Sequence, residues 1–393
     1  MPGNNKIVAR LCLRFPGHRS TNTLGNTINQ YGRYPLIMNA KKIPERNQTI
    51  DVVRGLLMLY IVFIIHGLFW VGLLPKIARS PILFEMPLIF LISGYALYLA
   101  ESNKKGKEQP SGFKQYLKFM LARLSRILLP YFAYAIVCIV ICFVYSQYDS
   151  QSTWQFSQIV AAWLNPFADR SHYTFDYLNG HLWFIPPFLL VTAVLPLAIK
   201  LKLPIHIPLW ILMAGATAAI YILSLCDFPA SYLLKSVSFY LLWAVFGYHI
   251  ANLGISAYNT KYLKIAIISI AALLIIFSLN SDARILDMQN NKFPPNAIFF
   301  IFSCLWASIF LTLATVFQNK SQDFSNLATQ WWLKPFIFAG YSIYLWQGVG
   351  YSIAIRFGNH FGLPIGVTWL TGLLVTVALG VLASPIERIR IRF

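Results

Sequence analysis

Long apolar runs separated by short polar segments make up most of the chain after residue 50. Each run is long enough to cross a hydrocarbon layer about 30 Å thick as an α-helix, which satisfies its own backbone hydrogen bonds. None alternates in the manner of a membrane β-strand. The runs cover residues 52–74, 82–100, 127–146, 182–199, 207–225, 232–253, 261–279, 296–317, 335–357 and 363–383. The pattern predicts an all-α, polytopic membrane bundle of about ten transmembrane helices.

Composition and charge agree with this class. Hydrophobic residues make up 57% of the chain and charged residues 11%, whereas soluble domains have about 25% charged residues. If the loops alternate between two sides, 24 Lys and Arg residues fall on the side of the termini, 7 on the other, and Arg54 lies within the first span. The positive-inside rule then predicts cytoplasmic termini. The net charge of +19 is therefore explained by the Lys and Arg residues that set the membrane topology, and we expect no nucleic-acid partner.

Polar segments precede and follow the apolar runs. We expect a basic, disordered cytoplasmic tail at 1–50, a transmembrane domain at 51–387 and a short basic cytoplasmic tail at 388–393. Met38 begins a polar lead into the first span, which suggests that translation starts there and that residues 1–37 are dispensable. The five Cys residues are scattered without a CxxC pair, so we expect no disulfide framework, bound metal or bound cofactor.

The first span carries two ionisable side chains that a lipid-facing helix would not keep. Arg54 lies near its cytoplasmic end, and His66 follows 12 residues later, which is about 18 Å and about 120° further along an α-helix. We therefore expect the two side chains at successive levels of an interior cavity, where ionisable groups indicate function. Two structural alternatives remain. Arg54 would also fit at the lipid headgroups or beside Asp51, and His66 in a hydrogen bond between helices.

Three further charged side chains extend this hypothesis to both ends of the bundle. Glu85 lies near the outer end of the second span, where a carboxylate within reach of His66 would orient the imidazole. An interfacial carboxylate is the alternative for Glu85. Arg123 and Arg126 share one side of a basic amphipathic segment at the cytoplasmic face. Their guanidinium groups suit a phosphate-rich ligand, and anionic lipid headgroups would suit them equally.

Six segments together resemble the acyltransferase-3 family of integral membrane acyltransferases. They occur in the family's order and are TIDVVRGLLMLYIVFIIH, FEMPLIFLISGYAL, RLSRILLPY, GHLWFIP, NKFPP and AGYSIYLWQ, within a similarity over about residues 48–385. The resemblance implies a ten-helix protein of the cell inner membrane. Such a protein transfers an acyl group, usually acetyl, from the co-substrate acyl-coenzyme A (acyl-CoA) to a hydroxyl of an extracytoplasmic or lipid-linked glycan. It also implies essential roles for Arg54 and His66, and donor binding by Arg123 and Arg126.

Two residues of GHLWFIP are candidates for binding the acceptor. His181 and Trp183 lie at the outer start of the fourth span, where they would offer a hydrogen bond and an aromatic surface to a sugar ring. Anchoring at the membrane interface would also explain Trp183. This chain departs from many family members in having Glu85 and Gln347 where they have His. Any proton relay through those histidines is therefore altered.

Two mechanisms and two functions fit these residues. His66 would act either as a general base on the acceptor hydroxyl or as a nucleophile that carries the acyl group as an acyl-imidazole. The alternative to an enzyme is a polytopic transporter or flippase, in which Arg54, Glu85 and His66 form an ion or proton pathway.

Overall fold

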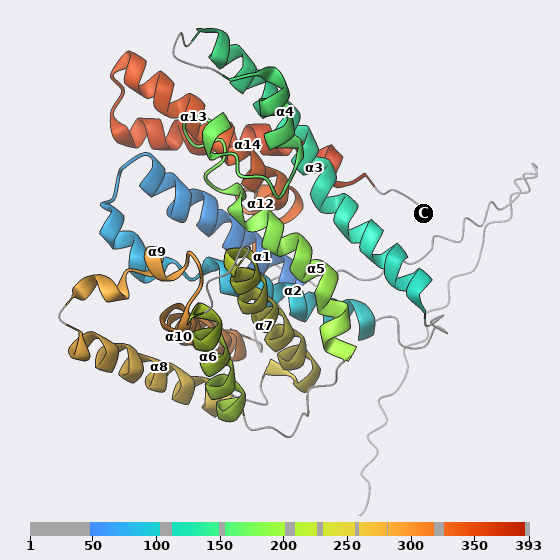
Figure 1. Ribbon diagram of the computed structural model, residues 1–393, viewed down its shortest axis with the longest axis vertical. Helices are drawn as coiled ribbons and strands as arrows, with labels where there is room; N and C mark the ends of the chain where they lie inside the picture. The colour runs from blue at the N-terminus through green and yellow to red at the C-terminus, as the bar shows by residue number, and fades with distance from the viewer. Residues whose placement is uncertain are drawn as a thin grey trace, which may run out of the picture. The chain divides into compact units, whose positions relative to one another are not determined.

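Each of the ten apolar runs folds as a helix in the computed structural model (Figure 1), which describes residues 48–102, 112–148, 154–200, 209–225, 231–255, 259–280, 282–317 and 326–389. The helices are α1 (Gln48–Tyr60) continued by η1 (Ile61–Leu68), α2 (Glu85–Ser102), α3 (Phe113–Tyr148), α5 (Ile185–Lys200), α6 (Leu209–Leu225), α7 (Ser231–Leu253), α8 (Asn259–Leu279), α10 (Ala297–Phe317), α13 (Gly340–Phe361) and α14 (Ile365–Glu387). Among the described residues, eight helices are long and apolar enough to cross a membrane. The all-α, polytopic membrane fold is confirmed.

Shorter helical elements lie between the spans or form the starts of spans. They are η2 (Lys76–Ile82), α4 (Phe156–Leu164), η3 (Ser171–Tyr173), η4 (Leu182–Phe184), η6 (Ala283–Leu286), α9 (Met288–Asn291) and α12 (Lys334–Phe338). The predicted span at 335–357 is divided, because α12 ends before Ala339 and α13 begins at Gly340.

The predicted tails lie mostly outside the described residues. α1 begins at Gln48 and α14 ends at Glu387, and residues 46–393 form one compact unit. Met38 and the suggested start of translation also lie outside the described residues, so that hypothesis stays a prediction.

α3 joins the basic segment and the third span in one helix. It has 36 residues with Pro130 inside it, and at 1.5 Å per residue it is about 54 Å long. This exceeds the thickness of a bilayer hydrocarbon core, about 30 Å, and the part of α3 before the apolar run that begins at Ile127 carries its basic residues.

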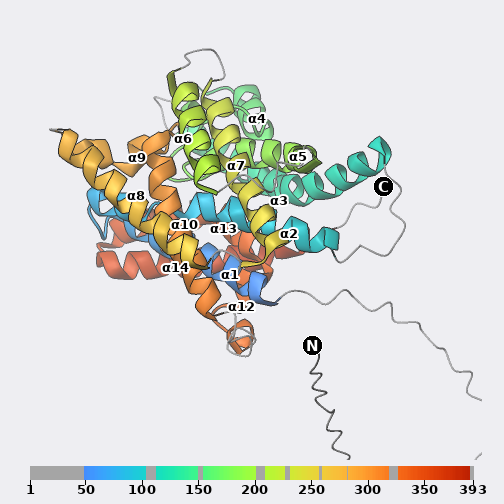
Figure 2. The same ribbon diagram turned by 90° about the horizontal axis from the view of Figure 1, so that it is seen from below.

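Small residues allow the closest contacts between helices. The buried residues of α14 recur at every fourth position and are Thr368, Gly372, Thr376, Gly380 and Ser384. This stripe faces α13, and a Cβ atom on Gly380 would lie 2.5 Å from the Cα atom of Ile343. Small side chains let the backbones of membrane helices approach closely. Figure 2 shows α13 and α14 side by side.

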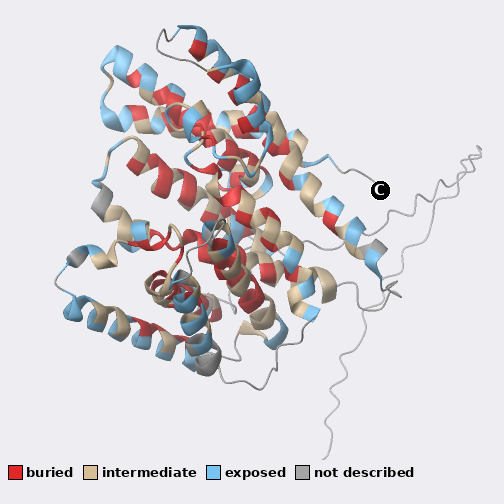
Figure 3. Ribbon diagram, viewed as in Figure 1, coloured by how far each residue is buried: buried red, intermediate tan, exposed pale blue. Residues whose placement is uncertain are grey.

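The distribution of buried residues agrees with a helix bundle surrounded by lipid. Buried residues concentrate where the central helices meet, whereas α8 exposes much of its surface (Figure 3). The exposed side chains of α8 are themselves apolar, among them Ile268, Leu274 and Ile275. An apolar exposed face is expected where a helix contacts lipid instead of water.

Candidate active site

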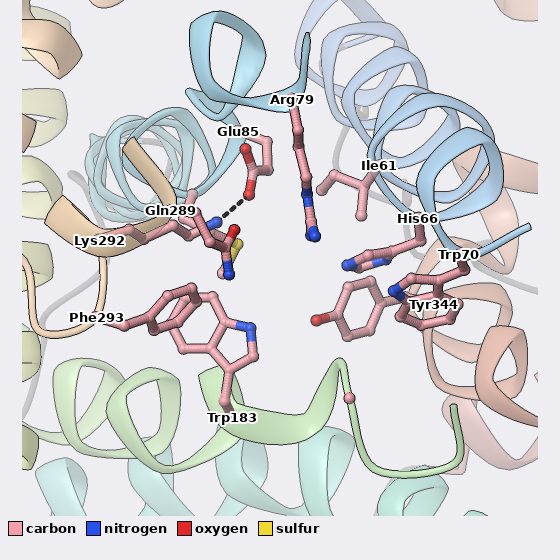
Figure 4. A pocket seen from close by; sticks show the side chains of 12 residues that line it. Ile61, His66, Trp70, Arg79, Glu85, Trp183, Gln289, Lys292, Phe293 and Tyr344 are labelled. Carbon is pink, nitrogen blue, oxygen red and sulfur yellow. Dashed lines mark hydrogen bonds and ion pairs between the residues drawn. The ribbon is translucent and has the colours of Figure 1, made fainter. Parts of the chain in front are cut away.

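Segments far apart in the sequence enclose one cavity of about 100 Å³ (Figure 4). Its lining includes His66, Arg79, Glu85, Trp183 and Lys292. Arg79 lies between the first two spans, Trp183 follows the connection after α3, and Lys292 lies in the connection before α10. These connections are all predicted to lie outside, so the predicted topology puts the cavity at the outer end of the bundle.

His66 lies in a π-helical segment. α1 is α-helical as far as Tyr60, and η1 continues it as a π-helix from Ile61 to Leu68. Hydrogen bonds from residue i to i+5 widen the turn. The predicted angle between Arg54 and His66 assumes a continuous α-helix. That assumption is wrong beyond Tyr60. Such segments are frequent at functional sites.

Side chains from α13 and α14 hold the π-helical segment. The Tyr351 hydroxyl donates a 3.0 Å hydrogen bond to the Val62 carbonyl, and Trp369 Nε1 donates a 3.4 Å bond to the Phe63 carbonyl. Gly67 leaves space for both donors, because a Cβ atom there would overlap the Tyr351 hydroxyl and lie 2.9 Å from Trp369 Nε1. The residue next to His66 therefore has to be small.

The imidazole of His66 is oriented by Gln347. Nδ1 of His66 lies 2.9 Å from Oε1 of Gln347, and both side chains are buried. With the amide oxygen toward the ring, Nδ1 carries the proton, because a carbonyl oxygen can only accept. Nε2 then keeps its lone pair, and Figure 4 shows a ring nitrogen of His66 turned toward the cavity. This is the tautomer that a general base requires.

A stack of aromatic rings fixes the plane of the imidazole. The rings of His66 and Trp70 are 4.4 Å apart and inclined by 20°, and Trp70 stacks in turn on Tyr177 at 4.9 Å. The Tyr177 hydroxyl donates a 2.7 Å hydrogen bond to the Trp70 carbonyl. The stack and the bond to Gln347 together leave the imidazole little freedom to rotate.

Glu85 lines the same cavity but has a different partner from the one predicted. Its Oε1 accepts a hydrogen bond from Nζ of Lys292 in an ion pair of which 3% of each side chain is exposed. The predicted orienting contact to His66 is made instead by Gln347. Burial lowers the pKa of the Lys292 ammonium, and the adjacent Glu85 carboxylate opposes that shift. The NKFPP motif therefore supplies a cavity residue as well as the turn before α10.

Arg79 is a cavity residue that the sequence does not distinguish from other charged residues in the polar connections. Its guanidinium extends into the cavity between Glu85 and His66 (Figure 4) and lies within electrostatic range of both. It also lies 5.7 Å from the centre of the Phe69 ring. Its position depends on the fold of η2, which no local pattern predicts.

The two predicted acceptor residues differ in position. Trp183 lines the cavity, with its ring 5.1 Å from Nζ of Lys292. The His181 side chain is fully buried behind the lining, and its Nε2 bonds to the Leu345 carbonyl at 2.9 Å. The predicted contact of His181 with an acceptor is therefore not available in this conformation, in which His181 supports the cavity wall.

The three arginines predicted for the cytoplasmic side lie close together. Arg123 is within electrostatic range of Arg126 and Arg54. Glu387 is within range of Arg54 and accepts a 2.9 Å hydrogen bond from the Ser342 hydroxyl. We call Arg54, Arg123 and Arg126 the arginine cluster. Arg54 is not part of the lining of the cavity described above, so a cavity that Arg54 and His66 share stays a prediction.

Comparison with known proteins decides the family. A family model described as an acyltransferase domain, that of the acyltransferase-3 family, matches residues 47–386. The chain belongs to the acyltransferase-3 family. Searches of curated proteins and of solved structures gave no match. The resemblance is confirmed, and the protein is a multi-pass membrane acyltransferase.

One helix of this acyltransferase-3 protein contacts both functional regions. In α13, the Ser342 hydroxyl bonds to Glu387 beside the arginine cluster. Two residues later, the Tyr344 hydroxyl bonds to the His181 carbonyl at 2.6 Å, and Gln347 bonds to His66. The departures Glu85 and Gln347 thus serve different contacts. Gln347 holds the imidazole, whereas Glu85 neutralises a buried lysine.

Proposed function

We propose that this acyltransferase takes an acyl group, in the simplest case acetyl, from acyl-CoA at the cytoplasmic face of the cell inner membrane. It transfers the group to a hydroxyl of an extracytoplasmic or lipid-linked glycan. The observation that carries this proposal is the buried His66 imidazole, held at Nδ1 by Gln347 with its other nitrogen toward the cavity.

The positions of the two functional regions support a donor and an acceptor from opposite sides. The arginine cluster, which includes Arg123 and Arg126, provides the guanidinium groups that suit the phosphates of coenzyme A. The cavity, with Trp183 and His66, contains residues of three of the connections predicted to lie outside. The extended pantetheine arm of the donor would carry the thioester from the arginine cluster to His66.

The proposed reaction is general-base catalysis of acyl transfer. The acceptor hydroxyl gives its proton to Nε2 of His66 while its oxygen forms a bond to the thioester carbonyl carbon. The tetrahedral intermediate then collapses and the carbon–sulfur bond breaks. Coenzyme A leaves as a thiolate and takes the proton from the imidazolium, so His66 is regenerated. General-base catalysis typically contributes about 10²- to 10⁴-fold in rate.

Transfer of radiolabel from acetyl-CoA tests this proposal. The acceptor is surface polysaccharide from cells that lack this protein, and the enzyme is the purified chain in lipid nanodiscs. We expect labelled polysaccharide from the wild type and from His360→Ala, whose side chain is exposed beyond the cavity. We expect none from His66→Ala, which should still insert into the nanodisc and elute as a folded protein. Movement of polysaccharide across vesicles without acylation would instead indicate a transporter.

Rapid-quench experiments without acceptor separate the two roles of His66. A general base leaves no label on the protein, whereas a nucleophile leaves an acyl-imidazole that is lost in His66→Ala. We expect no labelled protein, because in the proposed reaction the acyl group passes directly from the thioester to the acceptor oxygen while His66 takes only the proton.

A further inference from the structure

Three buried polar atoms on the lining of the cavity have no hydrogen-bond partner among the described residues. They are Nε of Arg79, Oε2 of Glu85 and Oε1 of Gln289. They belong to η2, α2 and α9, so no single local distortion explains all three. Buried polar atoms are normally paired. Three unpaired atoms around one cavity therefore indicate a polar ligand.

The chemistry of the three atoms defines that ligand. The carboxylate oxygen of Glu85 and the amide oxygen of Gln289 accept hydrogen bonds, whereas Nε of Arg79 donates one. Because Oε1 of Glu85 is already bound by Lys292, Oε2 is held in place to accept. A ligand that pairs all three must supply two donors and one acceptor, which two hydroxyl groups provide together.

The remaining walls of the cavity suit the ring that bears those hydroxyls. Trp183 and Phe293 contribute aromatic surfaces whose ring centres are 4.6 Å apart. Figure 4 shows Gln289 and Glu85 across the cavity from His66, with Arg79 between them. A sugar residue has several hydroxyls around an apolar ring face, so it can meet the three polar atoms while another hydroxyl faces His66.

We propose that Glu85, Gln289 and Arg79 bind two further hydroxyl groups of the same sugar residue that is acylated next to His66. This inference rests on the proposed acyltransfer and deepens it, because it restricts the acceptor to a residue with at least three oxygen functions in reach. A simple lipid alcohol or a phenol would leave the three atoms unpaired, and sites built for a hydroxyl discriminate strongly against analogues that lack it.

Substitution of Gln289 tests the hydroxyl-binding role. Gln289→Met has a similar shape but offers no oxygen, and Gln289→Glu keeps an oxygen that accepts. Gln289→Asn shortens the side chain by one methylene group, so the amide oxygen no longer reaches as far into the cavity. Gln330→Met is the matched control, because Gln330 is exposed and remote from the lining. For each variant, the KM for polysaccharide from cells lacking this protein is compared with the rate of acetyl-CoA hydrolysis when no acceptor is present.

The expected result is a rise of about 10-fold in the KM for polysaccharide in the Met and Asn variants, as for the loss of one hydrogen bond. In these variants the KM for polysaccharide should rise by a larger factor than any fall in the rate of acetyl-CoA hydrolysis, and melting temperatures near that of the wild type show that the variants fold. Gln289→Glu and Gln330→Met should keep a KM near the wild type.

Two outcomes would overturn the inference while leaving the proposed acyltransfer intact. One is an unchanged KM in both Gln289→Met and Gln289→Asn with an active wild type. The other is an equal loss of hydrolysis and transfer, which would mean that Gln289 supports the catalytic centre and not the acceptor. A wild type that neither hydrolyses acetyl-CoA nor labels polysaccharide would refute the proposed function itself.

Discussion

Nδ1 of His66 and Oε1 of Gln347 lie 2.9 Å apart, although 281 residues separate them in the chain. This contact joins the first span to α13 and sets which nitrogen of the imidazole faces the cavity. A hydrogen bond to the far ring nitrogen fixes the tautomer of a histidine. The catalytic competence of His66 therefore depends on a residue that does not itself line the described cavity.

Substitution of Gln347 should reduce turnover without removing donor binding. Gln347→Met deletes the acceptor for Nδ1–H, and we expect kcat to fall by about 10- to 100-fold, as for a loss of ~1–3 kcal/mol. Gln347→His should retain most of the activity, because a ring nitrogen can accept the same bond. Steady-state kinetics with acetyl-CoA measure both. Wild-type kcat in Gln347→Met would show that this bond does not orient the catalytic base.

Gly67 should tolerate no side chain. Gly67→Ala places a methyl group against the Tyr351 hydroxyl and Trp369 Nε1, so we expect a loss of about 1–3 kcal/mol in stability and lower activity as His66 shifts. Gly366→Ala is the control, because nothing lies within 4 Å of its Cβ position. Adding Tyr351→Phe to Gly67→Ala removes the nearest obstacle and should recover part of the melting temperature. Equal melting temperatures for the two Gly→Ala variants would contradict the role of Gly67.

The buried pair of Glu85 and Lys292 should behave as a unit in unfolding experiments. Glu85→Leu leaves the Lys292 ammonium buried without its partner, and we expect a loss of about 3–5 kcal/mol. Lys292→Met should cost a similar amount. The double variant should be more stable than either single variant, because neither charge of the pair is then left buried without the other.

Denaturant unfolding in detergent micelles measures this coupling. Arg284→Gln is the control, because the ion pair of Arg284 with Asp282 is exposed to solvent and should contribute nothing measurable. Additive losses in the double variant would mean that the two residues act independently.

The arginine cluster should act on the phosphates of the donor. Arg123→Gln and Arg126→Gln should each raise the KM for acetyl-CoA by about 10- to 100-fold, since a hydrogen bond to a charged group contributes ~1.5–3 kcal/mol. With acetyl-pantetheine, which has no phosphate, the same variants should match the wild type. Equal effects on both donors would place the role of these arginines in folding or lipid binding instead.

The positions of the spans could be predicted because helix formation across a membrane depends on local sequence. Each span satisfies its own backbone hydrogen bonds, so a run of apolar residues is sufficient to define it. The exceptions show the limit of this rule. The π-helical turn at His66 depends on hydrogen bonds from Tyr351 and Trp369, which lie 289 and 306 residues further along the chain than the carbonyls that accept them, so no local pattern contains them.

The candidate site was predictable in part for the same reason. Buried charge in an apolar run identified His66 and Glu85, and both line the cavity. Arg79 and Gln289 lie in polar connections where charged and amide residues are ordinary. Their importance comes only from the tertiary fold that turns them inward. The partner of Glu85, Lys292, is 207 residues away and could not be deduced from spacing.

Sidedness of the reaction in sealed vesicles tests the central claim most directly. The purified chain is reconstituted so that only protein with outward-facing termini is retained, acetyl-CoA is supplied outside, and unacylated polysaccharide is enclosed inside. Mass spectrometry of the enclosed polysaccharide should show acetyl groups with the wild type and none with His66→Ala. Enclosed polysaccharide that is acetylated equally by His66→Ala, or that leaves the vesicles with its mass unchanged, would contradict transfer across the membrane through His66.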